Sequence, residues 1–523
     1  MTVKQHAAKT RLSEAVIWDL HEEYYEGSGV SAWGATATPY HPTSNNFITE
    51  AFAEQAVAFL QDYADHLDFS EPLYIMELGS GTGCFSYNFI RALTSKLSYF
   101  HRLKPLKWVY VATDIVPKNL DYWKNNGAFD DDIAAGRVDF ALFNAERDKT
   151  LELRLSGKTL AKSDFKNPVI LIANYFFDSL RNDEFHVNHG AIEEALVQFQ
   201  VPDDKFAFAE FRRTVSYRKI SKNYYNHPVM DAILEDYRGL FEEASILFPV
   251  SSLRTLDNIR RLSGNRLVVL SADKGFGYPQ YMVGHWEYTY SVHGSFSYMV
   301  NFDAIRRYFF LNDGELLSTA DPDLDILLNV GYVLDGFKGT LECTRYYFEE
   351  KMNKQNLTNY LPMVLRDTNS TKNTDPFLIK EFRAVVQISN YDALTFDRYA
   401  PKLFNYLEAH PPSPQQALTL LRILEKVEAN CYPLLGSGAP VWLGILYYKL
   451  QDYRRSLNIM EKSLKLHGPN ACAYYYIASS YETHFNQPEK ALACFNEALK
   501  LDPNDESTKA AIKRIRENIN ASH

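Results

Sequence analysis

The sequence predicts an α/β domain with a doubly wound parallel sheet, followed by an all-α domain. From about residue 70 to 270, short β-branched and aromatic runs alternate with helical stretches. Strands that read as continuous apolar runs are typical of parallel sheets covered on both faces. Beyond Pro376 apolar residues instead recur every three or four positions, which predicts helices. The end of the chain also contains an internal repeat, which is typical of helical arrays.

The strands of the first domain are expected at LYIMEL, KWVYVATDI, VDFALF, VILIAN and RLVVLSA. At about residues 185–250 the pattern changes to alternating strands and then two helical stretches, which predicts an α+β insertion. The polar segment DTNSTKNTDP, residues 367–376, predicts a domain boundary. We therefore divide the chain into an N-terminal helical segment expected to cover a cofactor (1–70), the α/β domain (71–366), a helical linker or capping region (377–436) and a repeat region (437–519).

Composition excludes several classes of protein. The 523 residues are 46% hydrophobic and 14% aromatic, which indicates a folded chain rather than a disordered one. The net charge of −10 disfavours nucleic acid as a partner. No apolar stretch is long enough for a membrane span or a signal peptide, so we expect a cytoplasmic protein without membrane insertion. The five cysteines form no C-x-x-C pair, and neither a disulfide framework nor a metal site is expected.

The sharpest motif is MELGSGTGCFSYNFI, which places Glu77, Gly79, Gly81 and Gly83 between a predicted strand and a predicted helix. Glycines allow a tight turn and close approach of a ligand, and the helix start offers free N–H groups. The third glycine comes one residue too early for the dinucleotide pattern G-x-G-x-x-G. The motif instead resembles the first motif of class I S-adenosylmethionine methyltransferases with a Rossmann-like sheet. That resemblance implies S-adenosyl-L-methionine as cofactor, with Glu77 near its methionine part and the glycines beneath its ribose. An ordinary glycine turn is the alternative.

Two further strand ends complete the predicted cofactor site. Asp114 ends the next strand, and its carboxylate suits the two hydroxyls of a ribose. The alternative is an N-cap for the helix that starts near Pro117. The strand in VDFALFNAERD ends at Asn144 and Ala145, where the methyltransferase resemblance implies contacts to adenine; a plain turn is the alternative there.

LIANYFFDSLRNDEFHV, residues 171–187, resembles the Asn-Glu-Phe-Phe-Asp-Ala-Leu-Pro segment of the MidA-like methyltransferases associated with mitochondrial complex I assembly. TPYHPTSNNFITEAFAEQAVAFL resembles that family's cofactor-covering segment, and VVLSADKGFGYPQY and HGSFSYMVNFDAI resemble its late strands. The resemblance spans roughly residues 15–310 and implies catalytic positions for Asn174 and Asp178. Tyr175 stands where the family has Glu, and Arg181 where it has Pro, so a carboxylate suited to a substrate guanidinium is absent.

Other polar residues nearby have weaker patterns. Asp183 and Glu184 are interpreted as a solvated turn, with orientation of a nucleophile as the alternative. His285 or His293, both in HWEYTYSVHGSFSY, is a candidate general base, because imidazole titrates near pH ~6.5; a structural role is the alternative.

The repeat region resembles tetratricopeptide (TPR) repeats. Ser456, Met460 and Ser463 align with Ala491, Phe495 and Ala498 at a spacing of 35 residues, one more than the ~34 of a TPR. Two repeats need a cap to be stable, and residues 377–436 are expected to supply it. Because concave helical arrays bind other chains, we expect a protein or peptide partner at the TPR-like region.

These observations predict an S-adenosylmethionine-dependent methyltransferase. Its acceptor is expected to be a protein side chain of a partner recruited by the TPR-like tail, and the reaction an in-line transfer that depends mainly on alignment. Two alternatives stay open. One is a non-catalytic assembly or scaffold protein that still binds the cofactor, which Tyr175 favours. The other is a small-molecule methyltransferase.

Overall fold

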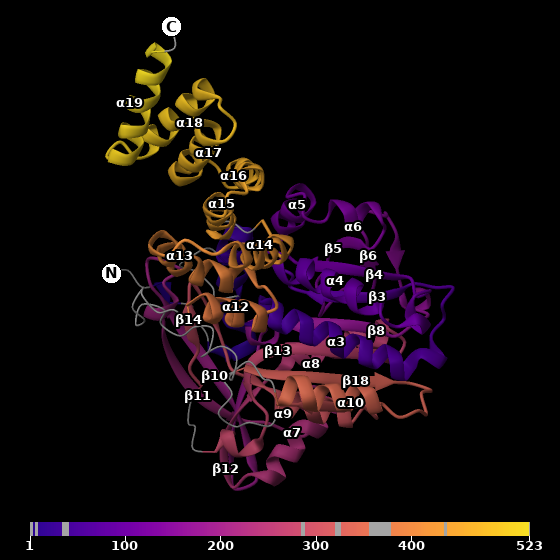
Figure 1. The fold of residues 1–523 in the computed structure, drawn as a ribbon. Coiled ribbons are helices and arrows are strands. Elements are labelled where there is room, and N and C mark those ends of the chain that lie inside the picture. Colours follow the sequence, from indigo (N-terminus) through magenta and orange to yellow (C-terminus); the bar gives the residue numbers. More distant parts are fainter. Residues whose placement is uncertain are drawn as a thin grey trace. The chain divides into compact units, whose positions relative to one another are not determined.

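The computed structural model describes residues 4–5, 9–33, 41–283, 288–319, 326–354, 378–433 and 437–521 (Figure 1). The chain forms two compact units, one of Met1–Ser44 with Ile48–Leu361 and the other of Asn45–Phe47 with Pro362–His523. The boundary predicted at residues 367–376 lies outside the described residues.

The first unit is built on a mixed, eight-stranded sheet with the order β17-β18-β13-β8-β3-β4-β5 and β16 beside β13. β5, β4, β3, β8 and β13 are parallel, as the apolar runs predict. β18 and β17 extend the sheet antiparallel, and the sequence analysis did not predict this edge. The strands are β3 (Leu73–Leu78), β4 (Trp108–Asp114), β5 (Val138–Leu142), β8 (Val169–Asn174), β13 (Arg266–Phe276), β16 (Val300–Asn301), β17 (Glu315–Ser318) and β18 (Ile326–Leu334).

The central strands are apolar because both faces of the sheet are covered. Every residue of β3 is buried, and in the sheet Ile75 lies between Tyr110 of β4 and Ile170 of β8. The helices of this unit are α1 (Val16–Ser28), α2 (His41–Ser44), α3 (Asn46–Tyr63), α4 (Cys84–Leu97), α5 (Pro117–Asn125), α6 (Asp130–Ala134), α7 (Pro228–Leu240), α8 (Val250–Leu262), α9 (Phe302–Phe310) and α10 (Glu342–Tyr347).

The segment predicted as an insertion forms a second, antiparallel sheet with the order β1-β10-β9-β12. β11 and β2 both pair with β10, so strands from the start of the chain join this sheet. Its strands are β1 (Lys4–Gln5), β2 (Thr10–Arg11), β9 (Asp183–Asn188), β10 (Ala191–Val201), β11 (Arg212–Lys219) and β12 (Glu243–Phe248). Two short hairpins add β6 (Leu151–Glu152) with β7 (Thr159–Leu160), and β14 (Ser291–His293) with β15 (Ser295–Ser297).

The described part of the second unit is helical, as predicted for the end of the chain. Its helices are α12 (Leu378–Ile388), α13 (Ala393–Ala409), α14 (Pro414–Ala429), α15 (Ala439–Lys449), α16 (Tyr453–His467), α17 (Ala471–Thr483), α18 (Pro488–Leu501) and α19 (Glu506–Ala521). The aligned repeat positions are buried in both α16 and α18. Gly444 of α15 allows close packing on α16, since a Cβ there would lie 2.5 Å from Met460.

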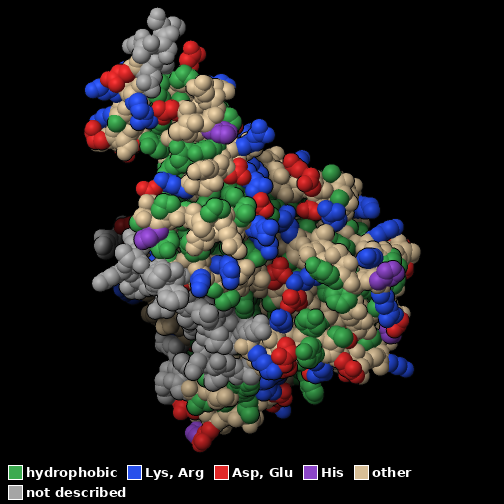
Figure 2. All heavy atoms as spheres, viewed as in Figure 1, with side chains coloured by type: hydrophobic (Ala, Val, Ile, Leu, Met, Phe, Trp, Pro, Cys, Tyr) green, Lys and Arg blue, Asp and Glu red, His purple; other side chains and the backbone are tan. Residues whose placement is uncertain are grey.

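The surface carries charges of both signs. On the face drawn in Figure 2, Lys and Arg side chains lie interspersed with Asp and Glu side chains. No helix in the described ranges is both long enough and apolar enough to cross a membrane.

Candidate cofactor and acceptor site

The candidate site is a cavity of about 200 Å³ in the first unit. Segments that follow β3, β4, β5 and β8 contribute to its lining, together with the end of β13. β3 lies between β4 and β8, so the strand order reverses beside it. In open α/β sheets, ligands bind at such a reversal, outside the carboxyl ends of the strands.

The glycine loop after β3 lies at this reversal. Gly79 and Gly81 have φ angles of +61° and +52°, which disfavour any residue with a side chain. A Cβ at Gly79 would lie 3.2 Å from the Phe176 ring, and one at Gly81 would lie 3.1 Å from the Trp33 ring. Of the predicted glycines Gly79 lines the cavity, whereas Gly81 and Gly83 do not, and Gly83 is the N-cap of α4.

Glu77 occupies a different place from the predicted one. Its carboxylate is buried, accepts a hydrogen bond of 2.8 Å from the Tyr110 hydroxyl and accepts another from Ser86. Burial raises the pKa of Glu77. The carboxylate thus ties β3 to β4 and α4, and it does not line the cavity. The expected contact between Glu77 and a methionine moiety therefore has no support in the geometry.

Asp114 lines the cavity at the end of β4. Its carboxylate accepts hydrogen bonds from the Gly81 N–H (3.1 Å), the Asn119 amide (2.9 Å) and the Val116 N–H (3.0 Å). Burial raises the pKa of Asp114. A carboxylate has about four acceptor positions, and the Ile115 N–H is a further donor to this one, so a ligand hydroxyl would have to share or replace one of these hydrogen bonds. The alternative role as helix cap is wrong, because Val116 is the N-cap of α5.

Asn144 and Ala145, predicted to contact adenine, line the cavity after β5. The Asn258 side chain of α8 donates a hydrogen bond of 2.9 Å to the Ala145 carbonyl and fixes this loop. Ser251 and Thr255 of α8 also face the cavity, and the Thr255 hydroxyl is buried without a hydrogen-bond partner in the described part of the chain. The contribution of α8 to the site was not predicted, because this helix lies about 110 residues from the loop that it supports.

The segment after β8 is strained and firmly held. Tyr175 has a φ of 45°, in the left-handed region that costs a non-glycine residue about 1–3 kcal/mol. The fully buried Asp273 carboxylate accepts the N–H groups of Phe177 (2.9 Å) and Asp178 (3.1 Å) and holds the segment in place. Backbone strain of this kind is concentrated at functional sites.

Of the two predicted catalytic residues, Asp178 lines the cavity and Asn174 does not. Both side-chain amide atoms of Asn174 are nevertheless buried without a partner among the described residues. Burial raises the pKa of Asp178, while the nearby Lys274 charge lowers it. The neighbouring Asp273, also buried, has a pKa raised well above the ordinary value, by burial and by the Asp178 charge.

Of the two candidate bases, His293 lines the cavity, and His285 lies outside the described residues. The Nε2 atom of His293 is 3.0 Å from the Ser297 hydroxyl. Burial and then the Lys274 charge lower the pKa of His293, so its ring is neutral at neutral pH. His21, which sequence analysis missed, also lines the cavity, and burial lowers its pKa to about 3.

The cavity is lined by part of the predicted covering segment, residues 1–70. The lining side chains come from α1 and the turn after it, and they are Trp18, His21, Glu22, Tyr25 and Trp33. The motif that resembles the family's covering segment begins at Thr38, and residues 38–40 lie outside the described residues. The aromatic and acidic run WDLHEEYYEG was the available signal in the sequence.

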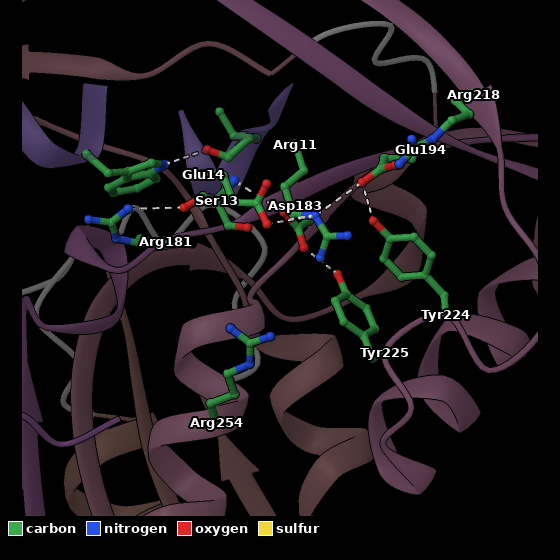
Figure 3. Close-up of polar contacts among 12 residues, drawn as sticks. Arg11, Ser13, Glu14, Arg181, Asp183, Glu194, Arg218, Tyr224, Tyr225 and Arg254 are labelled. Atoms are coloured by element: carbon green, nitrogen blue, oxygen red, sulfur yellow. Dashed lines mark hydrogen bonds and ion pairs between the residues drawn. The ribbon is translucent and has the colours of Figure 1, made fainter. Parts of the chain in front are cut away.

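A hydrogen bond to the buried Asp183 and an ion pair with the buried Glu194 anchor this N-terminal segment to the second sheet (Figure 3). Asp183 accepts hydrogen bonds from the Ser13 N–H (3.2 Å) and the Tyr225 hydroxyl (2.7 Å). Glu194 lies 3.5 Å from Arg11. The sequence pattern suggested that Asp183 and Glu184 form a solvated turn, but both are buried. The N-terminal segment covers Asp183, and Arg213 forms an ion pair of 2.9 Å with Glu184.

No protein-family model matches the chain, and no curated protein is significantly similar to it. A solved structure from Burkholderia thailandensis, suggested to be a methyl transferase and bound to S-adenosyl-homocysteine, is 13% identical, with a TM-score of 0.42 over 66% of this chain and 91% of that one. The DhpI–SAH complex is 11% identical, with a TM-score of 0.27 over 61% and 98%. The MamA protein is 14% identical, with a TM-score of 0.25 over 31% and 80%. At TM-scores below 0.5 these likenesses carry no argument, and the function proposed for this chain depends on its own residues.

Proposed function

We propose that the first unit is an S-adenosylmethionine-dependent methyltransferase with a doubly wound, MidA-like sheet. The proposal is supported mainly by one observation. The cavity at the reversal of strand order is lined both by the glycine loop and by a carboxylate at the end of the next strand. Gly79 and Asp114 both line it. The missing third glycine of the dinucleotide pattern favours an adenosyl amino acid over a dinucleotide.

The residues present fit this cofactor. Asp114 is placed to accept a ribose hydroxyl, and Asn144 and Ala145 lie where an adenine ring would extend beyond β5. The rings of Phe176 and Trp33 lie against the glycine loop and provide π faces for a sulfonium cation. The cofactor supplies an electrophilic methyl group. The protein aligns the acceptor with that group and excludes water by covering the cavity with α1.

The cavity is smaller than the ~300–1,000 Å³ usual for ligand sites. The side chains against the glycine loop explain the difference, because Trp33 and Phe176 occupy the space directly over Gly81 and Gly79. Binding of the cofactor therefore requires these two rings to shift. Tryptophan fluorescence should report this movement, and the signal should be reduced in Trp33→Phe.

The helical tail supports a protein acceptor. Its aligned positions Ala491, Phe495 and Ala498 are buried between helices, as TPR-like packing requires. The partner would be a protein or peptide bound by this tail in the cytoplasm. The rival proposal is a scaffold protein that binds the cofactor without transferring a methyl group, because Tyr175 replaces the carboxylate that an arginine acceptor needs.

One experiment separates the two proposals. The full chain is incubated with S-adenosylmethionine carrying a tritiated methyl group, alone and with cell lysate. A methyltransferase labels an acceptor in a time-dependent manner, and excess S-adenosylhomocysteine suppresses the label. A chain that binds S-adenosylhomocysteine in calorimetry but labels nothing would favour the scaffold.

A further inference from the structure

Three ionisable side chains meet at the end of the cavity formed by β8, β13 and β14. Asp178, Lys274 and His293 all line it. The Lys274 charge lowers the pKa of both Asp178 and His293, although burial is the larger influence on each. The three groups therefore lie within electrostatic range of one another, beside the strained Tyr175.

Lys274 brings a half-buried positive charge to this end of the cavity. Its ammonium lies 5.7 Å from the centre of the Tyr175 ring. Within the ranges that the structure describes, it forms no ion pair and its ammonium makes no hydrogen bond. Asp178 interacts electrostatically with this cation but does not form an ion pair with it. The partly desolvated ammonium therefore still favours an anionic ligand, because pairing restores the electrostatic stabilisation lost with water.

His293 brings a neutral ring to the same place. Its Nε2 lies 3.0 Å from the Ser297 hydroxyl, whereas Nδ1 is buried without a partner in the described chain. If Nε2 carries the proton toward Ser297, Nδ1 keeps a lone pair for an incoming proton. A neutral imidazole of this kind serves as a general base.

Much of the remaining lining is aromatic, beside charged side chains that include Glu22, Arg147 and Arg181. Trp18, Tyr25, Trp33, Tyr175 and Phe176 line the cavity. Tyr25 and Trp33 are in ring contact at 5.4 Å. Such walls favour a planar aromatic ligand, which stacks on them at little cost in conformational entropy.

We propose that this end of the cavity takes an aromatic hydroxyl, from a small phenol or a tyrosine side chain, as the methyl acceptor. This inference rests on the proposed methyltransferase function. His293 removes the hydroxyl proton and Lys274 stabilises the resulting phenolate oxygen. That oxygen forms a bond to the methyl carbon while the carbon–sulfur bond breaks, and the electron pair of that bond stays on sulfur as a neutral thioether. The proton then passes from His293 to solvent.

The same groups disfavour other acceptors. A guanidinium or ammonium acceptor would meet the positive charge of Lys274. A carboxylate acceptor is already ionised at neutral pH and leaves His293 without a proton to remove. The phenolic hydroxyl makes use of both side chains and of the aromatic walls.

The first test is spectroscopic and needs no turnover. The full chain with saturating S-adenosylhomocysteine is mixed with 4-nitrophenol, whose anion absorbs visible light, and the mixture is titrated with base. The bound phenol should ionise about one pH unit lower than in buffer, a tenfold shift in its ionisation constant. Lys274→Met should remove the shift and Lys274→Arg should keep it. Lys162→Met, which changes a lysine outside the cavity, should leave the shift unchanged. Absence of binding, or a shift that persists in Lys274→Met, overturns the proposal.

The second test identifies the source of the hydroxyl. Labelled methyl transfer is measured to 4-nitrophenol, N-acetyl-L-tyrosinamide and N-acetyl-L-argininamide. Transfer to the tyrosine derivative indicates a protein side chain, and transfer to 4-nitrophenol alone indicates a small phenol. His293→Gln should lower either rate by about 100-fold or more while the spectroscopic shift persists. Preference for the arginine derivative, or no transfer to any probe by a chain that binds S-adenosylhomocysteine, overturns this inference but not cofactor binding. Failure to bind S-adenosylhomocysteine overturns the proposed function itself.

Discussion

Asp114 shows how one side chain serves both the fold and the site. Its carboxylate joins the glycine loop to β4 through the Gly81 N–H and still lines the cavity. Asp114→Asn should weaken S-adenosylhomocysteine binding by about 1.5–3 kcal/mol, the usual value of a hydrogen bond to a charged group. Calorimetry measures the loss.

The matched control for this change is Asp139→Asn. Asp139 is also buried and also accepts backbone N–H groups, those of Leu155 (2.8 Å) and Ser156 (3.0 Å), but it does not line the cavity. The Asp139→Asn change should lower the melting temperature without lowering the affinity for S-adenosylhomocysteine. If Asp114→Asn behaves in the same way, Asp114 is purely structural.

His21 should make the first unit sensitive to acid. Its folded pKa of about 3 lies below the ordinary 6.5, so below pH 6.5 the unfolded chain binds a proton that the folded chain does not. The free energy of unfolding should therefore fall by about 1.4 kcal/mol per pH unit as the pH drops from 6.5 towards 3. This contribution is fully present above pH 6.5.

The variant His21→Phe removes the titrating group and keeps an aromatic ring beside Phe296, 4.9 Å away. Urea unfolding of both proteins at pH 7.5 and 5.5 isolates the contribution of His21 to the free energy of unfolding. The buried carboxyls with raised pKa values change this free energy in the opposite direction, but they do so equally in both proteins. The variant should gain about 1 kcal/mol relative to the native chain at the lower pH. An identical pH dependence would show that His21 is protonated in the folded chain.

Among the structural elements, the glycine loop is the one whose change should most directly affect cofactor binding. Gly81→Ala combines a left-handed backbone with a Cβ that meets the Trp33 ring at 3.1 Å. Gly136→Ala has a similar φ of +66° and no heavy atom near its Cβ. Both should lose about 1–2 kcal/mol of stability through strain, while only Gly81→Ala should also lose affinity for S-adenosylhomocysteine. If calorimetry gives the two variants equal affinities for S-adenosylhomocysteine, the glycine loop is not part of the cofactor site.

The elements that sequence analysis found share a local signal. The five parallel strands are short apolar runs, so period was enough to place them, and Asp114 follows from its position at a strand end. Asn144 and Asp178 were chosen because the sequence around them resembles methyltransferase motifs. Glu77 was misjudged because its partners Ser86 and Tyr110 lie 9 and 33 residues away. The edge strands β17 and β18 were not predicted.

Which part of the predicted covering segment, residues 1–70, lines the cavity was not predicted, for a related reason. α1 reaches the cavity only because β2 and residues near it attach to the second sheet through Asp183 and Glu194, which are about 170–183 residues away in sequence. No local periodicity encodes such pairing. Lys274 was missed as well, because a lone lysine near the end of an apolar strand has no motif around it.

For the whole molecule, we expect the first unit to bind the cofactor and the second unit to bind the protein partner. Every residue that lines the cavity belongs to the first unit. A chain ending at residue 361 should therefore bind S-adenosylhomocysteine within about threefold of the full-length affinity, a difference of ~0.6 kcal/mol. Methyl transfer to a protein partner in lysate should fall, since the TPR-like helices are absent. Loss of cofactor binding by a folded, monodisperse fragment would contradict this division.

The central claim is that the cavity beside the glycine loop binds an adenosyl amino acid. Isothermal titration calorimetry of the full chain with S-adenosylhomocysteine, and separately with NAD, tests it most directly. We predict one site with micromolar affinity for S-adenosylhomocysteine, about −8 kcal/mol, and no saturable heat with NAD. Saturable binding of NAD with no response to S-adenosylhomocysteine would contradict the account.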